Sequence, residues 1–326
     1  MKIPPDYKIT PKILEIITKI EANRIFLEAL SLSSDVTEKI KRVSFLKSSL
    51  FSARIEGNPL TLATVDESDD TLRKIEVFNI LEAFKYIEKE VKPETKITRE
   101  TVSALHRFVL KNISSSGGFF RKEAGAIFNQ AGVAVYLSPP PESVSPFINS
   151  LVNYINAGIG DFPLVTAFIS HLMFEKIHPF IDGNGRVGRL LIFTILKKKN
   201  WHYPIFVPLE EYLDEHKDDY YYYLDVGLKN PTGYLEFMLE AFLDRTEKMR
   251  KELGEKSQKE EKLFLPPRQE EIYRIIKEHK NISLDFIKRR FLKVPERTLR
   301  YDLKKLQEKN IIVKIGTTKG VYYCAK

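Results

Sequence analysis

The chain has 326 residues, of which 43% are hydrophobic, and a formal net charge of +8. A chain of this length and composition can bury a sizeable core in more than one domain, which argues against disorder as its default state. No apolar run reaches the roughly 18 residues that a membrane helix needs, no signal-peptide pattern follows Met1, and the single cysteine, Cys324, excludes an intramolecular disulfide, so we expect a cytoplasmic protein with no membrane partner.

The positive charge is concentrated at the C-terminal end of the chain. Pro266 to Lys326 holds 16 Lys and Arg against 7 Asp and Glu, whereas residues 1–265 hold 36 against 37. The first part is therefore electrically balanced and the last part is basic. This asymmetry indicates two domains with different partners.

Residues 10–245 are predicted to be mainly helical. Apolar residues recur there at steps of three and four, which is the period of a helix that buries one face. Two such series are Ile40, Val43, Leu46 and Leu50, and Ile75, Phe78, Leu81 and Phe84.

One short β-hairpin is predicted to interrupt the helices. Two segments, 125–129 and 133–138, flank Gln130-Ala131-Gly132, and the prolines at 139–141 close the stretch. Turn residues between two short segments, followed by a rigid proline turn, are typical of a hairpin.

Two apolar helices with a glycine-rich loop between them follow. Residues 164–177 are apolar on nearly every side, which predicts a helix through the middle of the domain that ends near Pro179. Residues 187–196 form the second helix, and Asp182 to Gly185 form the loop. The predicted unit is helix, glycine-rich loop, helix.

The last part of the chain resembles a winged helix. Pro266-Pro267 marks a boundary, followed by helices at 269–279, from Ser283 and after Pro295, and by strands at 311–315 and 321–324. The predicted fold is thus a mainly α domain with a β-hairpin and a small C-terminal α+β domain. The predicted divisions are 1–95 for an N-terminal helical region, 96–245 for the core, 246–265 for a charged helical linker and 266–326 for the winged helix.

The loop carries the residues that point to chemistry. Gly183 and Gly185 allow the backbone to approach a ligand closely, and the positive end of the next helix lies behind them, which together favour an anion. Arg186 and Arg189, three residues apart, can face the same anion, and guanidinium groups suit phosphate oxygens. The loop is therefore predicted to bind a polyphosphate.

Two further residues complete this candidate site. Asp182 is a hard oxygen ligand suited to Mg²⁺ beside phosphates, and His178 at the helix end can accept a proton near neutral pH. Residues 183–188 formally match the dinucleotide fingerprint, but that fingerprint requires a preceding strand, and here a helix is predicted before the loop. A phosphate loop of the NTPase type requires Lys-Ser/Thr, which this loop lacks. A glycine-rich turn with surface arginines is the alternative, and the convergence of polar groups argues against it.

The segment from His178 to Arg189 matches the His-x-Phe-x-Asp-Gly-Asn-Gly-Arg-x-x-Arg signature of the Fic family, and the chain resembles that family on this motif. The resemblance implies a protein adenylyltransferase that moves AMP from Mg-ATP to a Ser, Thr or Tyr hydroxyl. It implies His178 as the general base, Asp182 as the Mg²⁺ ligand and Arg189 as the γ-phosphate contact. The implied nucleotide-binding loop consists of Asp182, Gly183, Asn184, Gly185, Arg186, Val187, Gly188 and Arg189.

Three other segments are similar to Fic elements. Ser52 to Asn58 resembles the family's inhibitory motif, with Glu56 as the inhibitory residue, and the hairpin near 120–138 resembles the flap that clamps a target segment. Tyr220 and Tyr221 resemble the tyrosines beside the adenine pocket. Without the resemblance, Glu56 is a carboxylate at a helix end, where an arginine partner is expected.

Other functions stay open at this point. The body could sense a nucleotide within a DNA-binding regulator, or the site could transfer another nucleotide. The basic domain is expected to bind duplex DNA, with protein docking as the alternative. The predicted DNA face consists of Arg297, Thr298, Arg300, Lys304, Lys305 and Lys319. The expected protein partners are a target with a hydroxyl side chain, including the chain itself, and a homo-oligomer is compatible with the sequence.

Overall fold

The computed structural model describes the whole chain except residues 31, 33, 66–69, 129–133, 158–161, 202–205, 262–264, 280, 317–319 and 326, and except the side chains of 127, 128, 134, 135 and 255–261. The chain divides into two compact units, Met1–Glu255 and Lys256–Lys326. The predicted mainly α fold is confirmed. Within the described parts of the chain, no helix is both long enough and apolar enough to span a bilayer.

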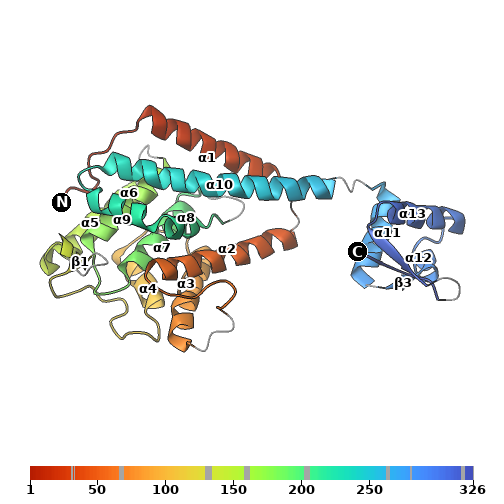
Figure 1. Ribbon diagram of the computed structural model, residues 1–326, viewed down its shortest axis with the longest axis horizontal. Helices are drawn as coiled ribbons and strands as arrows, with labels where there is room; N and C mark the ends of the chain where they lie inside the picture. The colour runs from red at the N-terminus through yellow and green to blue at the C-terminus, as the bar shows by residue number, and fades with distance from the viewer. Residues whose placement is uncertain are drawn as a thin grey trace. The chain divides into compact units, whose positions relative to one another are not determined.

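The first unit is built from helices and one hairpin (Figure 1). The helices are α1 (Pro11–Ala29), α2 (Ser34–Ile55), α3 (Thr71–Glu90), α4 (Arg99–Val109), α5 (Pro141–Ala157), α6 (Pro163–Ile177), α7 (Asn184–Lys198), α8 (Leu209–Glu215), α9 (Lys217–Val226) and α10 (Pro231–Glu261). Helix α10 passes through Gly254 without a break, so the charged segment predicted as a separate helical linker continues a helix that starts in the core.

Side-chain caps explain where several helices begin. The side chains of Thr10, Asp70 and Thr98 accept hydrogen bonds from backbone N–H groups three residues later, at the starts of α1, α3 and α4. Helix α4 has a full capping box, because Thr101 also bonds back to the Thr98 backbone. Each cap satisfies N–H groups that have no partner within the helix.

Helix α6 lies at the centre of the first unit, as its apolar composition predicts. Fourteen of its residues, from Leu164 to Ile177, are buried, and α7 packs against it. Figure 1 shows α1 alongside α10, and the contacts agree, since the Asn23 amide donates to Thr246 Oγ1 at 3.1 Å and Lys12 pairs with Glu240 at 2.7 Å. The long N- and C-terminal helices of this unit therefore brace each other.

The hairpin is present where the sequence predicts it. Strand β1 (Ala126–Phe128) pairs antiparallel with β2 (Ala134–Leu137), with Ala126 opposite Leu137 and an irregularity after Ile127. The predicted turn at 130–132 lies outside the described residues.

The second unit has a hydrophobic core of its own, which includes Ile276, Leu299 and Leu303. Its elements are α11 (Pro267–His279), β3 (Ile282–Ser283), α12 (Leu284–Arg290), α13 (Glu296–Glu308), β4 (Ile312–Ile315) and β5 (Tyr322–Ala325). The three predicted helices and two predicted strands are present. The structure adds β3, and the antiparallel sheet has the order β3-β5-β4.

Candidate functional site

The site begins at the C-terminal end of α6 with His178. Its N–H donates to the Phe174 carbonyl at 2.9 Å, and its backbone has the left-handed conformation, with φ of 48°. Its Nδ1 is buried and has no hydrogen-bond partner within the described structure. Burial lowers the pKa of the imidazole, which favours the neutral ring that can accept a proton.

Arg121, which the sequence did not single out, ties the base of the hairpin to His178. Its guanidinium is buried and donates to four carbonyl groups, those of His178 at 2.8 Å, Glu123 at 2.8 Å, Pro139 and Ile177 at 3.4 Å. A buried guanidinium normally pairs with a carboxylate or several carbonyls, because its donors need partners. Arg121 therefore fixes the start of the loop and both ends of the flap-like hairpin.

His106 on α4 holds the loop through hydrogen bonds of its ring. Its Nδ1 accepts from the Gly118 N–H at 2.8 Å, so its Nε2 carries the proton and donates to the Asp182 carbonyl at 3.0 Å. The ring stacks on Phe180, with centroids 3.6 Å apart. Burial lowers the pKa of His106 to about 4, which keeps the ring neutral in this bridging role.

Asn184 holds the loop closed from within. Its side-chain oxygen accepts from the Phe180 N–H at 2.9 Å, and its amide donates to the Phe180 carbonyl at 2.8 Å. Gly183, with φ of 79°, forms the N-cap of α7 in a conformation that favours glycine. Phe180 is fully buried and anchors the loop in the core.

Asp182 and Arg186 form an ion pair at the loop, between an exposed carboxylate and a buried guanidinium. Arg186 Nη2 lies 3.1 Å from both carboxylate oxygens of Asp182, and the Gly183 N–H donates to one of them at 2.6 Å. The Asp182 side chain is 65% exposed, whereas Arg186 is buried and its Nε has no partner in the described structure. The carboxylate is thus accessible, and the arginine retains a free donor.

Arg189 has a different set of partners. Its Nε donates to Ser52 Oγ at 2.9 Å, and its Nη2 donates to the Ser52 carbonyl at 2.8 Å and to Glu56 at 2.9 Å. Burial disfavours the charged form of Arg189, but the Glu56 carboxylate, together with Tyr220 and Tyr221, outweighs this effect and raises the pKa of Arg189. The two arginines predicted to share one anion are therefore engaged separately, and Arg189 is held by α2.

The Glu56 carboxylate also covers the glycine-rich loop. A Cβ atom added at Gly185 would collide with Glu56 Oε1 and would lie 3.1 Å from Arg189 Nη1. Helix α2 ends at Ile55, and Gly57, with φ of 95°, turns the chain away from the helix axis in the left-handed conformation typical of a glycine after a helix. Glu56 thus occupies the space next to the predicted phosphate cradle.

The two tyrosines of α9 differ in their surroundings. Tyr220 is 1% exposed, and its hydroxyl lies 2.7 Å from His171 Nε2 in the core. Tyr221 is 38% exposed, and its hydroxyl donates to the Ile55 carbonyl at the end of α2, at 3.1 Å. Of the two predicted nucleotide contacts, only Tyr221 has a substantially exposed ring.

Val187 and Gly188, near the start of α7, pack against the core. Val187 is fully buried, and a Cβ added at Gly188 would collide with the Glu175 carboxylate of α6 and lie 2.8 Å from His171 Nδ1. Gly188 therefore permits the close approach of α6 and α7.

Comparison with known proteins agrees with this geometry. Residues 96–196 match the Fic/DOC family model. The chain is 27% identical over 244 residues to a protein named protein adenylyltransferase Fic from Drosophila willistoni, and 26% identical over 244 residues to the protein of that name from Drosophila mojavensis. Each match covers 71% of this chain and 46% of the relative, so the chain spans about half the length of these relatives.

Two solved structures share the fold. A Fic family protein from Desulfovibrio desulfuricans G20 has a TM-score of 0.72 at 23% identity, covering 99% of this chain and 98% of that one. Fic-1 from C. elegans has a TM-score of 0.60 at 19% identity, covering 76% and 74%.

These findings define the class of protein. The chain contains a Fic domain, and its match includes His178 and the loop through Arg189. The family predicted from the sequence is confirmed, and the two Drosophila relatives carry the name protein adenylyltransferase Fic.

Proposed function

We propose that this chain is a protein adenylyltransferase that transfers AMP from Mg-ATP to a Ser, Thr or Tyr hydroxyl of a target protein. The observation that carries the proposal is the buried Nδ1 of His178, unpartnered within the described structure, beside a loop whose shape is fixed by Asn184, His106 and Arg121. The names of the relatives support the same reaction. Transfer of label from ATP, compared with CTP, GTP and UTP, tests the reaction and the choice of base.

The chemistry follows from this arrangement. The target hydroxyl forms a bond to the α-phosphorus, the bond from that phosphorus to the bridging oxygen breaks, and pyrophosphate leaves. His178 accepts the hydroxyl proton. The backbone N–H groups at 183–186 and the Arg186 guanidinium stabilise the phosphate charge, so catalysis comes from positioning and electrostatics.

The residues present fit a magnesium ion held mainly by the nucleotide. Within the described structure, no three His, Cys, Asp or Glu side chains gather into a metal site. Mg²⁺ commonly uses one or two carboxylates together with substrate phosphates, and Asp182 offers one exposed carboxylate at the loop. Asp182 would hold the ion, which would neutralise phosphate charge, and Arg186 would be free to turn to the phosphates.

Asp182→Ala is expected to lower Mg-dependent AMP transfer by at least about 100-fold, because metal neutralisation of a phosphoryl oxygen is worth several kcal/mol. Incorporation of label from ATP, measured across a Mg²⁺ titration, checks this. Asp182→Asn is the matched control, since the amide oxygen can still accept from the Gly183 N–H. Equal rates for Asp182→Ala with and without Mg²⁺ would show that the ligand is elsewhere.

We also propose that Glu56 inhibits the enzyme. The Glu56 carboxylate is bound to Arg189 and lies against Gly185, in the loop that we expect to bind the nucleotide phosphates. Arg189 cannot pair with Glu56 and a γ-phosphate in the same geometry. ATP bound beside Glu56 would therefore have its α-phosphorus misaligned for attack.

Tyr221→Phe is expected to raise wild-type transfer by about fivefold. The substitution removes the hydrogen bond to Ile55 that holds the end of α2, and one such bond is worth about 1 kcal/mol net. Rates of auto-modification check it, with Tyr222→Phe, whose side chain is 60% exposed, as the control. The same increase in a Glu56→Gly background would show that the effect does not pass through the inhibitory helix.

A second activity, binding of duplex DNA, is favoured by the outer face of α13. Arg297, Arg300 and Lys304 are exposed, and Thr298 and Lys305 are half-buried. Arg300 pairs with Glu296 and Lys305 with Glu308, whereas Arg297 and Lys304 have no ion pair within the described structure. Lys319, the predicted wing contact, lies outside the described residues.

Arg297→Ala with Lys304→Ala is expected to weaken binding of duplex DNA and to flatten its salt dependence. Each lost phosphate contact lowers the slope of log affinity against log salt by about 0.9. Titration of a labelled duplex between low and moderate salt measures both effects, and Lys85→Ala on the first unit is the control. Salt-independent binding, or none by the wild type, would favour a protein-docking role.

A further inference from the structure

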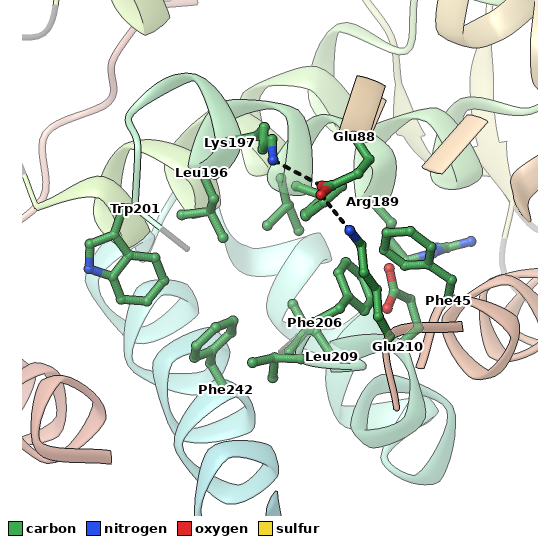
Figure 2. Close-up of a pocket in the computed structure, with 14 residues that line it drawn as sticks. Phe45, Glu88, Arg189, Leu196, Lys197, Trp201, Phe206, Leu209, Glu210 and Phe242 are labelled. Atoms are coloured by element: carbon green, nitrogen blue, oxygen red, sulfur yellow. Dashed lines mark hydrogen bonds and ion pairs between the residues drawn. The ribbon is translucent and has the colours of Figure 1, made fainter. Parts of the chain in front are cut away.

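A cavity of about 300 Å³ lies behind Arg189, within the first unit. Helix α2 contributes Phe45, α7 contributes Ile192 and Leu196, and α10 contributes Phe242 (Figure 2). The catalytic loop joins α7 at its N-terminal end, whereas the cavity follows α7 from Arg189 to Lys197. The cavity is therefore separate from the nucleotide site and shares only Arg189 with it.

The interior of the cavity is apolar and largely aromatic. Phe45, Leu196, Leu209 and Phe242 are each no more than 7% exposed, and the rings of Trp201 and Phe242 lie 5.8 Å apart. Protein interiors are normally filled to crystal-like density, and cavities that bind small ligands begin at about 300 Å³. A planar apolar body fits such walls, because aromatic rings contact one another edge to face or offset.

One edge of the cavity is charged. Figure 2 shows Glu88 between two ammonium groups, with Lys41 Nζ at 2.7 Å and Lys197 Nζ at 3.0 Å, and Lys41 also lies 3.9 Å from Glu38. The two lysine side chains are 26% and 20% exposed, so this edge reaches solvent. An ammonium has three donors, which leaves Lys197 able to bind a further anion.

We propose that this cavity binds a small amphipathic anion, with an aromatic body between α2, α7 and α10 and a carboxylate or sulfonate head on Lys41 and Lys197. Of the polar groups at the inner wall, Glu210 accepts from Ser48 Oγ at 2.6 Å and Arg189 is held by Ser52 and Glu56. These groups already have partners. The head is therefore placed at the lysine edge and not at the inner wall.

Occupation of the cavity stabilises the inhibited form. Helix α2 supplies one wall through Lys41 and Phe45, and the same helix carries Ser52 and Glu56, which hold Arg189. The cavity is complete only while α2 lies against α7, so the ligand selects that state. This regulatory half of the inference rests on the proposed AMP transfer, whereas binding itself does not.

Binding is tested on the full chain with 8-anilinonaphthalene-1-sulfonate, an aromatic sulfonate, by fluorescence titration and calorimetry without nucleotide. We expect saturable binding with one site per chain, its loss in Leu196→Trp, which fills the cavity, and a dissociation constant raised about tenfold in Lys197→Met. Lys198→Met, the adjacent residue and outside the lining, is the matched control and should bind as the wild type does.

Non-saturable binding, or equal affinity in the wild type and in a folded Lys197→Met variant, would overturn the site. The Lys197→Met variant keeps the test decisive if Leu196→Trp does not fold. In the regulatory arm, saturating probe should lower residual AMP transfer by the wild type and leave that of Glu56→Gly unchanged. Equal inhibition of both would overturn the coupling, and a Glu56→Gly variant inactive without probe would count against the proposed function instead.

Discussion

Glu56→Gly is expected to raise the rate of AMP transfer by about 100-fold or more. The substitution removes the carboxylate that binds Arg189 at 2.9 Å and crowds Gly185, so the arginine becomes free for the γ-phosphate. A misplacement of about 1 Å in a reacting group can cost about 100-fold in rate, and correcting it needs no new catalytic group. Incorporation of AMP from labelled ATP by wild type and variant measures the effect.

Two further variants test the physical cause. Glu56→Gln keeps the side-chain volume and a hydrogen-bond acceptor but loses the charge, so its rate should lie between those of the wild type and Glu56→Gly. Glu56→Gly combined with Arg189→Ala should fall back toward the wild-type rate, because the first change acts by releasing that arginine. Equal rates for wild type and Glu56→Gly would refute autoinhibition and leave the Fic domain assignment unaffected.

His178→Ala in the Glu56→Gly background is expected to lower transfer by about 100- to 10,000-fold, the range for loss of a general base. ATP affinity should change little, because the base acts on the hydroxyl proton and not on the bound phosphates. The activated background makes the loss of transfer measurable, and calorimetry with Mg-ATP measures the affinity for the nucleotide. Transfer at the rate of the parent enzyme would remove His178 from the mechanism.

The sequence predicted the central unit of the site because its signals are local. An all-round apolar segment predicts the buried helix α6, the proline and glycines mark its end and the loop, and a second apolar segment predicts α7. The structure starts α7 at Asn184, three residues before the predicted Val187, because Gly183 serves as the N-cap. The left-handed Gly57 after α2 was likewise predictable from residue type alone.

The supports of the loop could not be predicted, because they are distant in the chain. Arg121 reaches a carbonyl 57 residues away, and His106 reaches one 76 residues away, and neither belongs to a local motif. Nor does spacing show that Arg186 and Arg189 have different partners, since that depends on where α2 packs. Tyr220 and Tyr221 are adjacent, and only the packing of α9 decides which ring faces the core.

The left-handed backbone of His178 limits which substitutions probe its chemistry alone. A residue with a Cβ pays about 1–2 kcal/mol in that conformation, whereas asparagine adopts it readily. Alanine at 178 therefore changes the preferred backbone conformation as well as removing the imidazole. The change would also displace Arg121, because its guanidinium donates to the carbonyl of this residue. Asparagine retains the turn and lacks a proton acceptor of comparable basicity, so His178→Asn separates the shape of the loop from its reactivity.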